Sequence, residues 1–160
     1  MYGRRKPSTP PKQPAKNYAV WLLSRRDYSA AQLSDKMMAR GYPPEEVAEA
    51  MAFVQGHRFQ DDERFAQAKV QMSGRRLGNR RLRAELNEAG VATDTAEAQM
   101  AVLESEEARA CELVGRFTRQ VLDDKLKAKV WRFLAYRGFG VSAIQVAWRH
   151  LKAIAEEGPA

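Results

Sequence analysis

The sequence predicts an all-α fold, an elongated tandem array of three three-helix, helix-turn-helix-like repeats. Gly41, Gly90 and Gly138 each follow the last turn of an apolar-periodic helix, at spacings of 49 residues (41 to 90) and 48 residues (90 to 138). A helix often ends with its C′ residue in the left-handed region, which only glycine enters without a steric penalty. Three such stops on one spacing predict an internal repeat.

The residues around the three glycines keep the same offsets. The apolar residue after each glycine is expected to pack on the helix residue at C3. These pairs are Tyr42 with Met37, Val91 with Leu86, and Phe139 with Leu134. Four further columns are apolar in every copy: Leu33, Leu82, Val130; Val47, Ala96, Ile144; Met51, Met100, Trp148; and Val54, Leu103, Leu151. No segment shows the period-2 alternation of a half-buried strand, which excludes a sheet protein.

Residues 1–15 are predicted to form a disordered basic arm, because this proline-rich segment cannot bury apolar surface. The first repeat is predicted to span residues 16–57. Its middle helix opens at Ser29, three residues before Gln32, which is the capping-box spacing. Its last helix opens at Pro43 and Pro44, since proline suits the first turn of a helix.

The second repeat is predicted over residues 58–104. Asp61 is expected to cap its first helix, whose apolar face would be Phe65, Ala68 and Met72. The middle helix runs through Leu82 and Leu86. Asp94 is expected to cap the last helix, with Glu97 at the capping-box position.

The third repeat is predicted over residues 105–153, followed by a polar tail at 154–160. A longer first helix should begin near Glu104 and carry Leu113, Val114, Phe117 and Val121. Asp123 or Asp124 is expected to cap the middle helix, and Ser142, three before Gln145, the last. Units of about 45 residues rarely stand alone, so stacked neighbours should share the core. The extended shape that follows favours a binding surface over a catalytic pocket.

Composition points to an anionic partner. The formal charge is +7 and the sequence pI is about 9.8. This excess of positive charge favours binding to nucleic acid, although it could equally serve only to keep the protein soluble. The single cysteine, Cys111, excludes an intramolecular disulfide and a multi-cysteine metal site, and we expect a buried structural thiol. The absence of an apolar run of about 18 residues predicts no membrane span, and the basic N-terminus lacks the apolar segment of a secretory signal. A cytoplasmic protein is expected.

No catalytic, cofactor or metal site is predicted. His57 and His150 lie far apart and outside any metal-ligand pattern. The glycines at 74 and 78 lack the spacing and the Lys-Ser/Thr ending of a phosphate-binding loop. The Asp61–Glu63 acidic run is better explained by helix capping than by a cation site. The sequence therefore predicts that the protein is not an enzyme.

The basic residues carry the binding prediction. They belong to the outer faces, or the approach turns, of the three middle helices. We take as candidates Arg25, Arg26, Arg75, Arg76, Arg80, Arg81, Arg83, Lys127, Lys129, Arg132 and Arg137. They are expected to meet a phosphate backbone or the acidic face of a protein, although a solvated charged face is the simpler explanation for the scattered lysines. Sequence-specific duplex reading is disfavoured, because the last helices of the first two repeats begin with acidic residues.

The same residues resemble the RecX family of RecA regulators from about residue 17 to 152. The matching stretches are Leu22–Ser29, Arg40–Tyr42, Asp61–Ala66, Gly78–Leu86 and Arg132–Phe139. Each is weak alone, but their order and spacing are specific. The chain departs from the family's pattern in two places. The turn Gly56–Gln60, which precedes Phe65, is usually more apolar, and the proline-rich arm is individual to this sequence.

The resemblance implies a function as well as a fold. Members are curved, elongated arrays of three-helix units that bind RecA and its filament on single-stranded DNA. They block filament growth or promote its loss, which lowers ATP hydrolysis, strand exchange and coprotease activity. A monomer without cofactors is expected, with single-stranded DNA a further partner through the basic face. The alternative is a stand-alone helical protein that binds DNA or RNA without a recombinase.

Overall fold

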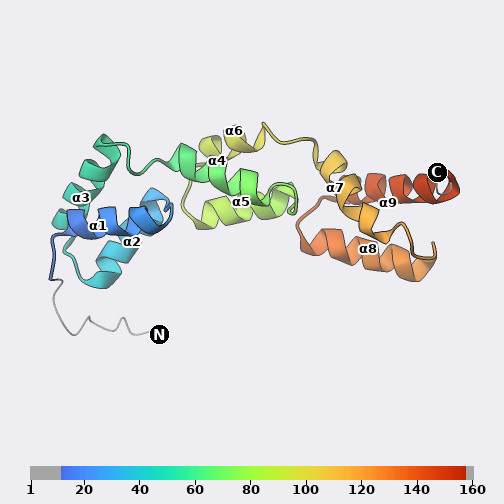
Figure 1. The fold of residues 1–160 in the computed structure, drawn as a ribbon, viewed down its shortest axis with the longest axis horizontal. Helices are drawn as coiled ribbons and strands as arrows, with labels where there is room; N and C mark the ends of the chain where they lie inside the picture. The colour runs from blue at the N-terminus through green and yellow to red at the C-terminus, as the bar shows by residue number, and fades with distance from the viewer. Residues whose placement is uncertain (1–11, 158–160) are drawn as a thin grey trace.

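The structure, a computed structural model, describes residues 12–157, and every regular element within that range is helical. The elements are α1 Ala15–Arg25, α2 Ala30–Arg40, α3 Pro44–Gly56, α4 Asp62–Ser73, α5 Asn79–Glu88, α6 Thr93–Met100, α7 Glu106–Val114, the 3-10 helix η1 Gly115–Phe117, α8 Asp124–Tyr136 and α9 Val141–Glu157. Figure 1 shows them as three successive groups along one axis, α1–α3, α4–α6 and α7–α9. The predicted all-α array of three-helix units is confirmed. Most of the predicted arm at 1–15 lies outside the described residues.

Each group of helices has its own apolar core. The middle helix supplies two deeply buried residues to each: Leu33 and Met37 in α2, Leu82 and Leu86 in α5, Val130 and Leu134 in α8. These residues are four apart, so they lie on one face of the helix. No helix of the described chain is both long and apolar enough to cross a membrane.

The three glycine stops are confirmed. Gly41, Gly90 and Gly138 have φ values of 105°, 78° and 85°. The amide after each glycine donates to the C3 carbonyl: Tyr42 to Met37 at 3.3 Å, Val91 to Leu86 at 3.0 Å, and Phe139 to Leu134 at 3.1 Å. This is the Schellman motif, and it brings the apolar residue after the glycine into the core of its own repeat.

The predicted columns are buried to different depths. Leu33, Leu82 and Val130 are at most 1% exposed. The column after the glycine, Val47, Ala96 and Ile144, is also buried. The two outer columns are mixed, since Met51, Leu103 and Trp148 are only half-buried. The repeat is therefore most regular around the middle helix.

Three of the predicted helix caps are confirmed. The Ser29 hydroxyl accepts from the Gln32 amide at 3.1 Å, and the Gln32 side chain accepts from the Ser29 amide at 3.3 Å, which completes the capping box. Asp61 accepts from the Glu63 amide at 2.8 Å, and Asp123 from the Leu126 amide at 2.7 Å. Pro44 is the first residue of α3, as expected.

Two predicted caps are wrong. Helix α6 begins at Thr93 after Ala92, so Asp94 lies inside its first turn, where a negative charge favours the helix dipole. Glu97 makes no capping box and pairs with Arg83 instead. Helix α9 begins at Val141, and the Ile144 amide donates to the Gly140 carbonyl at 3.0 Å, so Ser142 follows the cap position.

Other differences concern which residues face inward. Helix α4 buries Ala66 and Val70, whereas of the predicted face Phe65 packs half-buried against the core and Met72 is 74% exposed. Both sets have helical spacing, and the space left by α5 and α6 decides between them.

The first helix of the third repeat is shorter than predicted, since α7 ends at Val114. Phe117 follows in η1 and packs edge-on to Phe133, while Val121 is 81% exposed. Helix α9 runs to Glu157, past the predicted boundary at 153, so the predicted tail is partly helical.

The first two repeats meet at a joint whose buried polar side chains, Ser29 and Gln60, are neutral, and we call it the first joint. Buried Ser29 donates through its hydroxyl to the Ala89 carbonyl, beside the Gly90 stop. The Ala30 amide donates to the Asp62 carboxylate at 2.8 Å. Gln60, only 4% exposed, donates to the Tyr28 carbonyl at 3.3 Å and to Asp62 at 2.9 Å. The start of one middle helix is thereby held against the stop of the next.

Candidate binding groove at the second joint

Repeats two and three meet at a second joint of the same plan. The Gly78 amide, before α5, donates to the Arg137 carbonyl at 2.9 Å, and the Arg80 amide donates to the Gly138 carbonyl at 3.3 Å. A Cβ on Gly138 would lie 2.5 Å from the Arg81 Cβ and 2.6 Å from its amide nitrogen. The backbones approach this closely because both sides present glycine.

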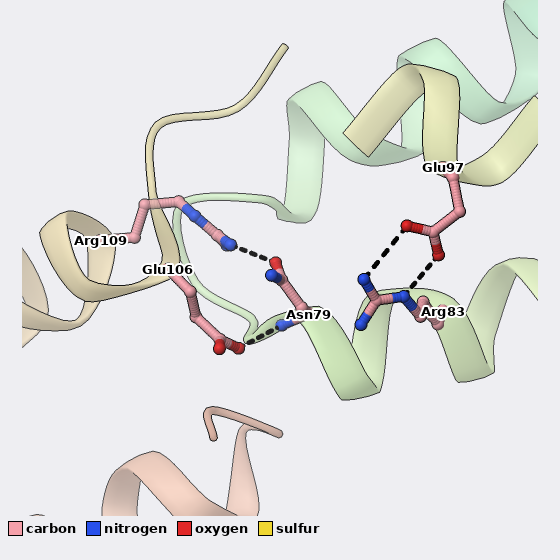
Figure 2. Close-up of polar contacts among 5 residues, drawn as sticks. All are labelled: Asn79, Arg83, Glu97, Glu106 and Arg109. Atoms are coloured by element: carbon pink, nitrogen blue, oxygen red, sulfur yellow. Dashed lines mark hydrogen bonds and ion pairs between the residues drawn. The ribbon is translucent and has the colours of Figure 1, made fainter. Parts of the chain in front are cut away.

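Arg109 of α7 is buried at this joint and is only 2% exposed. It donates to the Gly74 carbonyl at 2.6 Å, to the Leu77 carbonyl at 2.7 Å, and to the Asn79 side chain. Figure 2 shows Glu106 beside it, where its carboxylate accepts from the Asn79 amide at 2.6 Å. Arg109 and Glu106 therefore attach α7 to the turn before α5 and to the start of that helix.

Burial lowers the pKa of the Arg109 guanidinium, and the neighbouring acidic residues, Glu106 first, oppose that shift. Arginine stays charged despite such a shift. A buried charge is costly unless its donors are satisfied, and here the bonds to carbonyls and an amide oxygen satisfy them.

A groove of about 450 Å³ opens beside the second joint, and we call it the joint groove. It is lined by Ser73, Arg76, Leu77, Arg81, Glu85, Leu113, Arg116, Tyr136 and Arg137. These residues come from α4, α5, α7, η1, α8 and the turns between them. Four guanidinium groups thus face one open space with a single carboxylate among them.

Aromatic rings and a carboxylate hold three of these arginines. Arg137 lies 3.8 Å and Arg116 5.2 Å from the centre of the Phe133 ring, both within cation–π range. Arg81 lies 5.7 Å from the centre of the Tyr136 ring, and its Nε is 3.3 Å from Glu85. Guanidinium groups fixed by stacking keep donors for phosphate or carboxylate oxygens.

Glu85 is itself held between two cations. Its second oxygen lies 2.7 Å from the Lys69 Nζ. The hydrogen bond from Lys69, with further help from Arg81, holds the pKa of the Glu85 carboxyl below its ordinary range, although burial opposes the shift. Glu85 therefore remains ionised and neutralises part of the groove's charge, while Arg76, Arg116 and Arg137 form no salt bridge among the described residues.

The joint groove brings together only part of the predicted basic set. Arg76, Arg81 and Arg137 line it, and Arg116 lines it without having been predicted. The sequence carried no signal for Arg116, because the early end of α7 and the η1 turn set its position. The exposed Tyr136 was likewise missed as a groove residue.

The other predicted residues lie elsewhere. Arg80 donates across the second joint to the Ala135 carbonyl at 3.0 Å. Arg83 extends from α5 to Glu97 of α6, with bonds of 2.5 and 3.1 Å, as Figure 2 shows. Arg25 and Arg26 lie over the Trp21 and Tyr28 rings of the first repeat. The remaining members are exposed and do not line the groove: Arg75, Lys127, Lys129 and Arg132.

No metal-binding group of acidic, histidine or cysteine residues is found in the described chain. Cys111 is half-buried rather than fully buried, and burial raises the pKa of its thiol. A thiol with a raised pKa is a poor nucleophile at neutral pH. The groove thus offers binding chemistry, namely guanidinium donors and aromatic rings.

Comparison with known proteins places the chain in a family. The profile of the first three-helix domain of RecX matches residues 15–53, and that of the second matches residues 61–100. A regulatory protein RecX from Haemophilus ducreyi is 33% identical over 81% of this chain and 87% of its own length. The chain belongs to the RecX family. The RecX regulatory protein from Chromohalobacter salexigens is 37% identical over 82% of this chain and 89% of its own length.

The fold agrees with that assignment. The crystal structure of RecX from Lactobacillus salivarius superposes with a TM-score of 0.74, over 87% of this chain and 95% of that one. Its sequence identity is 16%, so this likeness concerns the fold alone. The three-helix repeats and their order are therefore those of RecX regulatory proteins.

Proposed function

We propose that this protein binds RecA and its filaments on single-stranded DNA, and that it mainly inhibits recombinase, ATPase and coprotease activity. The observation that carries the proposal is membership of the RecX family over most of the chain, through relatives named as regulatory proteins. The joint groove supports it, because four arginines in one open space suit the phosphates of a DNA strand inside such a filament.

The mechanism follows from differential binding. A filament assembles and disassembles through exchange between states, and a ligand shifts that exchange only by binding one state more tightly. In this proposal the array, whose three groups of helices follow one another along one axis, lies across neighbouring subunits of the filament. Contacts to phosphate position such an array without reading sequence, so inhibition should be independent of DNA sequence and should weaken as salt rises.

The test is single-stranded-DNA-dependent ATP hydrolysis by purified RecA. The wild-type protein should inhibit at amounts well below the RecA concentration, because one bound array blocks a growing filament. The double variant Arg76→Gln/Arg81→Gln should inhibit less, with unchanged helicity by circular dichroism. Arg119→Gln/Arg149→Gln removes the same charge outside the joint groove, so this control should inhibit like the wild type.

The competing function, nucleic-acid binding without a recombinase, gives a different result. It requires enough protein to coat the strand, so inhibition at low ratios contradicts it. Direct binding to labelled oligo(dT) separates the roles further. If Arg76 and Arg81 each contact a phosphate, the double variant should make the negative slope of log K against log salt less steep by about 1.4. An unchanged slope would remove the joint groove from the DNA-binding surface.

A further inference from the structure

The turn Gly56–Gln60 contains the one residue other than glycine in the described chain whose backbone is left-handed. The Phe59 amide donates to the Val54 carbonyl at 2.8 Å and the Arg58 amide to the Gln55 carbonyl at 3.0 Å. This is the bond pair that ends α2, α5 and α8, but here the left-handed position holds Arg58, with φ of 57°. Among residues 12–157, no other residue besides glycine has a positive φ.

Glycine would be the less strained choice at this position, as it is at the other three stops. The turn is kept in place by Arg64, which donates to the carbonyls of Arg58 at 3.0 Å and Phe59 at 2.6 Å. Backbone strain that the surroundings enforce clusters at functional sites. The side chain gained here is the guanidinium of Arg58.

That side chain lines a second groove, between α1 and the turn from α3 to α4, which we call the turn groove. Its volume is about 350 Å³, at the lower end of the range for ligand pockets. Its lining includes Val20, Leu23, Asp27, Arg58, Phe59 and Arg64. Val20 is 38% and Phe59 46% exposed, so this apolar surface has no partner within the described chain.

The Phe59 ring is held in place, not loose on the surface. Its centre lies 5.7 Å from that of the stacked His57 ring and 6.3 Å from that of Phe53, which it meets edge-on. One of its faces is thus already covered by an aromatic ring. Rigid aromatic side chains of this kind are frequent anchors of protein interfaces.

We propose that the turn groove docks a protein segment in which an apolar side chain is flanked by carboxylates. Val20, Leu23 and Phe59 match the apolar side chain, and the guanidinium groups of Arg58 and Arg64 match the carboxylates. Asp27 leaves the turn groove with two guanidinium groups and one carboxylate, whereas the joint groove has four guanidinium groups and one carboxylate and so suits the densely charged backbone of a nucleic-acid strand better. The inference rests on the proposed function in one respect, since it takes RecA as the protein that supplies the segment.

The test is the affinity of full-length variants for RecA in the absence of DNA. Phe59→Ser and Arg58→Gly should each weaken RecA binding about tenfold, the loss expected for an interface anchor. Arg58→Gly should at the same time raise the melting temperature by about 2–4 °C, because it relieves the left-handed strain. A variant that gains stability while losing affinity cannot owe the loss to misfolding. The control, Arg149→Ala, should change neither quantity.

The outcomes separate this inference from the proposed function. RecA affinity within twofold of wild type for both Phe59→Ser and Arg58→Gly would contradict the docking of RecA at the turn groove and would leave the proposed function untouched. Variants that keep RecA binding but lose oligo(dT) binding would assign the turn groove to nucleic acid, which also contradicts the docking proposal. A wild-type protein that neither binds RecA nor inhibits its ATPase contradicts the proposed function, and with it the partner named here.

Discussion

The two joints of the array use the same parts of their helices but different side chains. In each, the first amide of a middle helix donates to an acidic residue at the start of the next repeat: Ala30 to Asp62 in the first joint, Asn79 to Glu106 in the second. In each, the stop glycine of the following middle helix, Gly90 or Gly138, faces that helix start without room for a Cβ. The geometry is repeated, while the residues that make it are not.

The difference lies in what is buried. The first joint buries the neutral side chains of Ser29 and Gln60, whereas the second buries the charged Arg109. Arg109 donates to the carbonyls of Gly74 and Leu77, and the Gly78 and Arg80 amides add backbone bonds across the joint. A joint built on backbone bonds and a satisfied guanidinium holds a fixed geometry. The joint groove lies beside the joint that has backbone bonds across it.

The largest expected effect is the loss of the buried guanidinium. Arg109→Met keeps the apolar stem but leaves the Gly74 and Leu77 carbonyls without donors, so it should cost about 3 kcal/mol of unfolding free energy. Gln60→Met, its counterpart in the first joint, should cost about 1–2 kcal/mol. Urea titrations followed by circular dichroism measure both. Equal losses would show that the two joints are equally strong.

The stop glycines give the next largest effect. Gly138→Val and Gly90→Val both force a branched side chain into the left-handed region, at a cost of about 1–3 kcal/mol. Gly138→Val should be the worse of the two, because its Cβ would meet the backbone nitrogen of Arg81, whereas that of Gly90 meets only the Ala31 methyl. Thermal melts decide the order. An unchanged melting temperature for Gly90→Val would contradict the role of the shared stop.

The smallest effect concerns pH. The Lys69 hydrogen bond lowers the pKa of Glu85, and the Arg83 hydrogen bond lowers that of Glu97. A carboxyl whose pKa is lower in the folded state stabilises the fold above its unfolded-state pKa, and that contribution is lost as pH falls through the folded-state pKa. Stability should therefore decline below about pH 4.5, by under about 1 kcal/mol for each exposed pair. Glu85→Gln, measured by urea titration at several pH values, should flatten this decline, and an unaltered slope would contradict the pairing.

Features that depend on neighbouring residues could be predicted from sequence. The Gly41, Gly90 and Gly138 stops and the Ser29, Asp61 and Asp123 caps all satisfy backbone groups within a few residues. The inward face of α4 was predicted only in part, since Phe65 packs against the core but Ala66 and Val70 are the buried residues. Two stripes with helical spacing compete there, and only the packing against α5 and α6 decides between them. Glu97 was predicted as a capping residue, but its partner Arg83 lies fourteen residues earlier.

The sequence by itself determined that the chain forms three like units and where the middle helix of each ends, because a left-handed stop and an apolar column are local requirements. Only the tertiary structure decided which basic residues act together. Arg76, Arg81, Arg116 and Arg137 share one groove because glycines at 78 and 138 let two helix ends meet there. Arg109 holds these two repeats together through hydrogen bonds to residues at least thirty positions away in the sequence. Contacts across such separations depend on how the repeats stack, which no local pattern encodes.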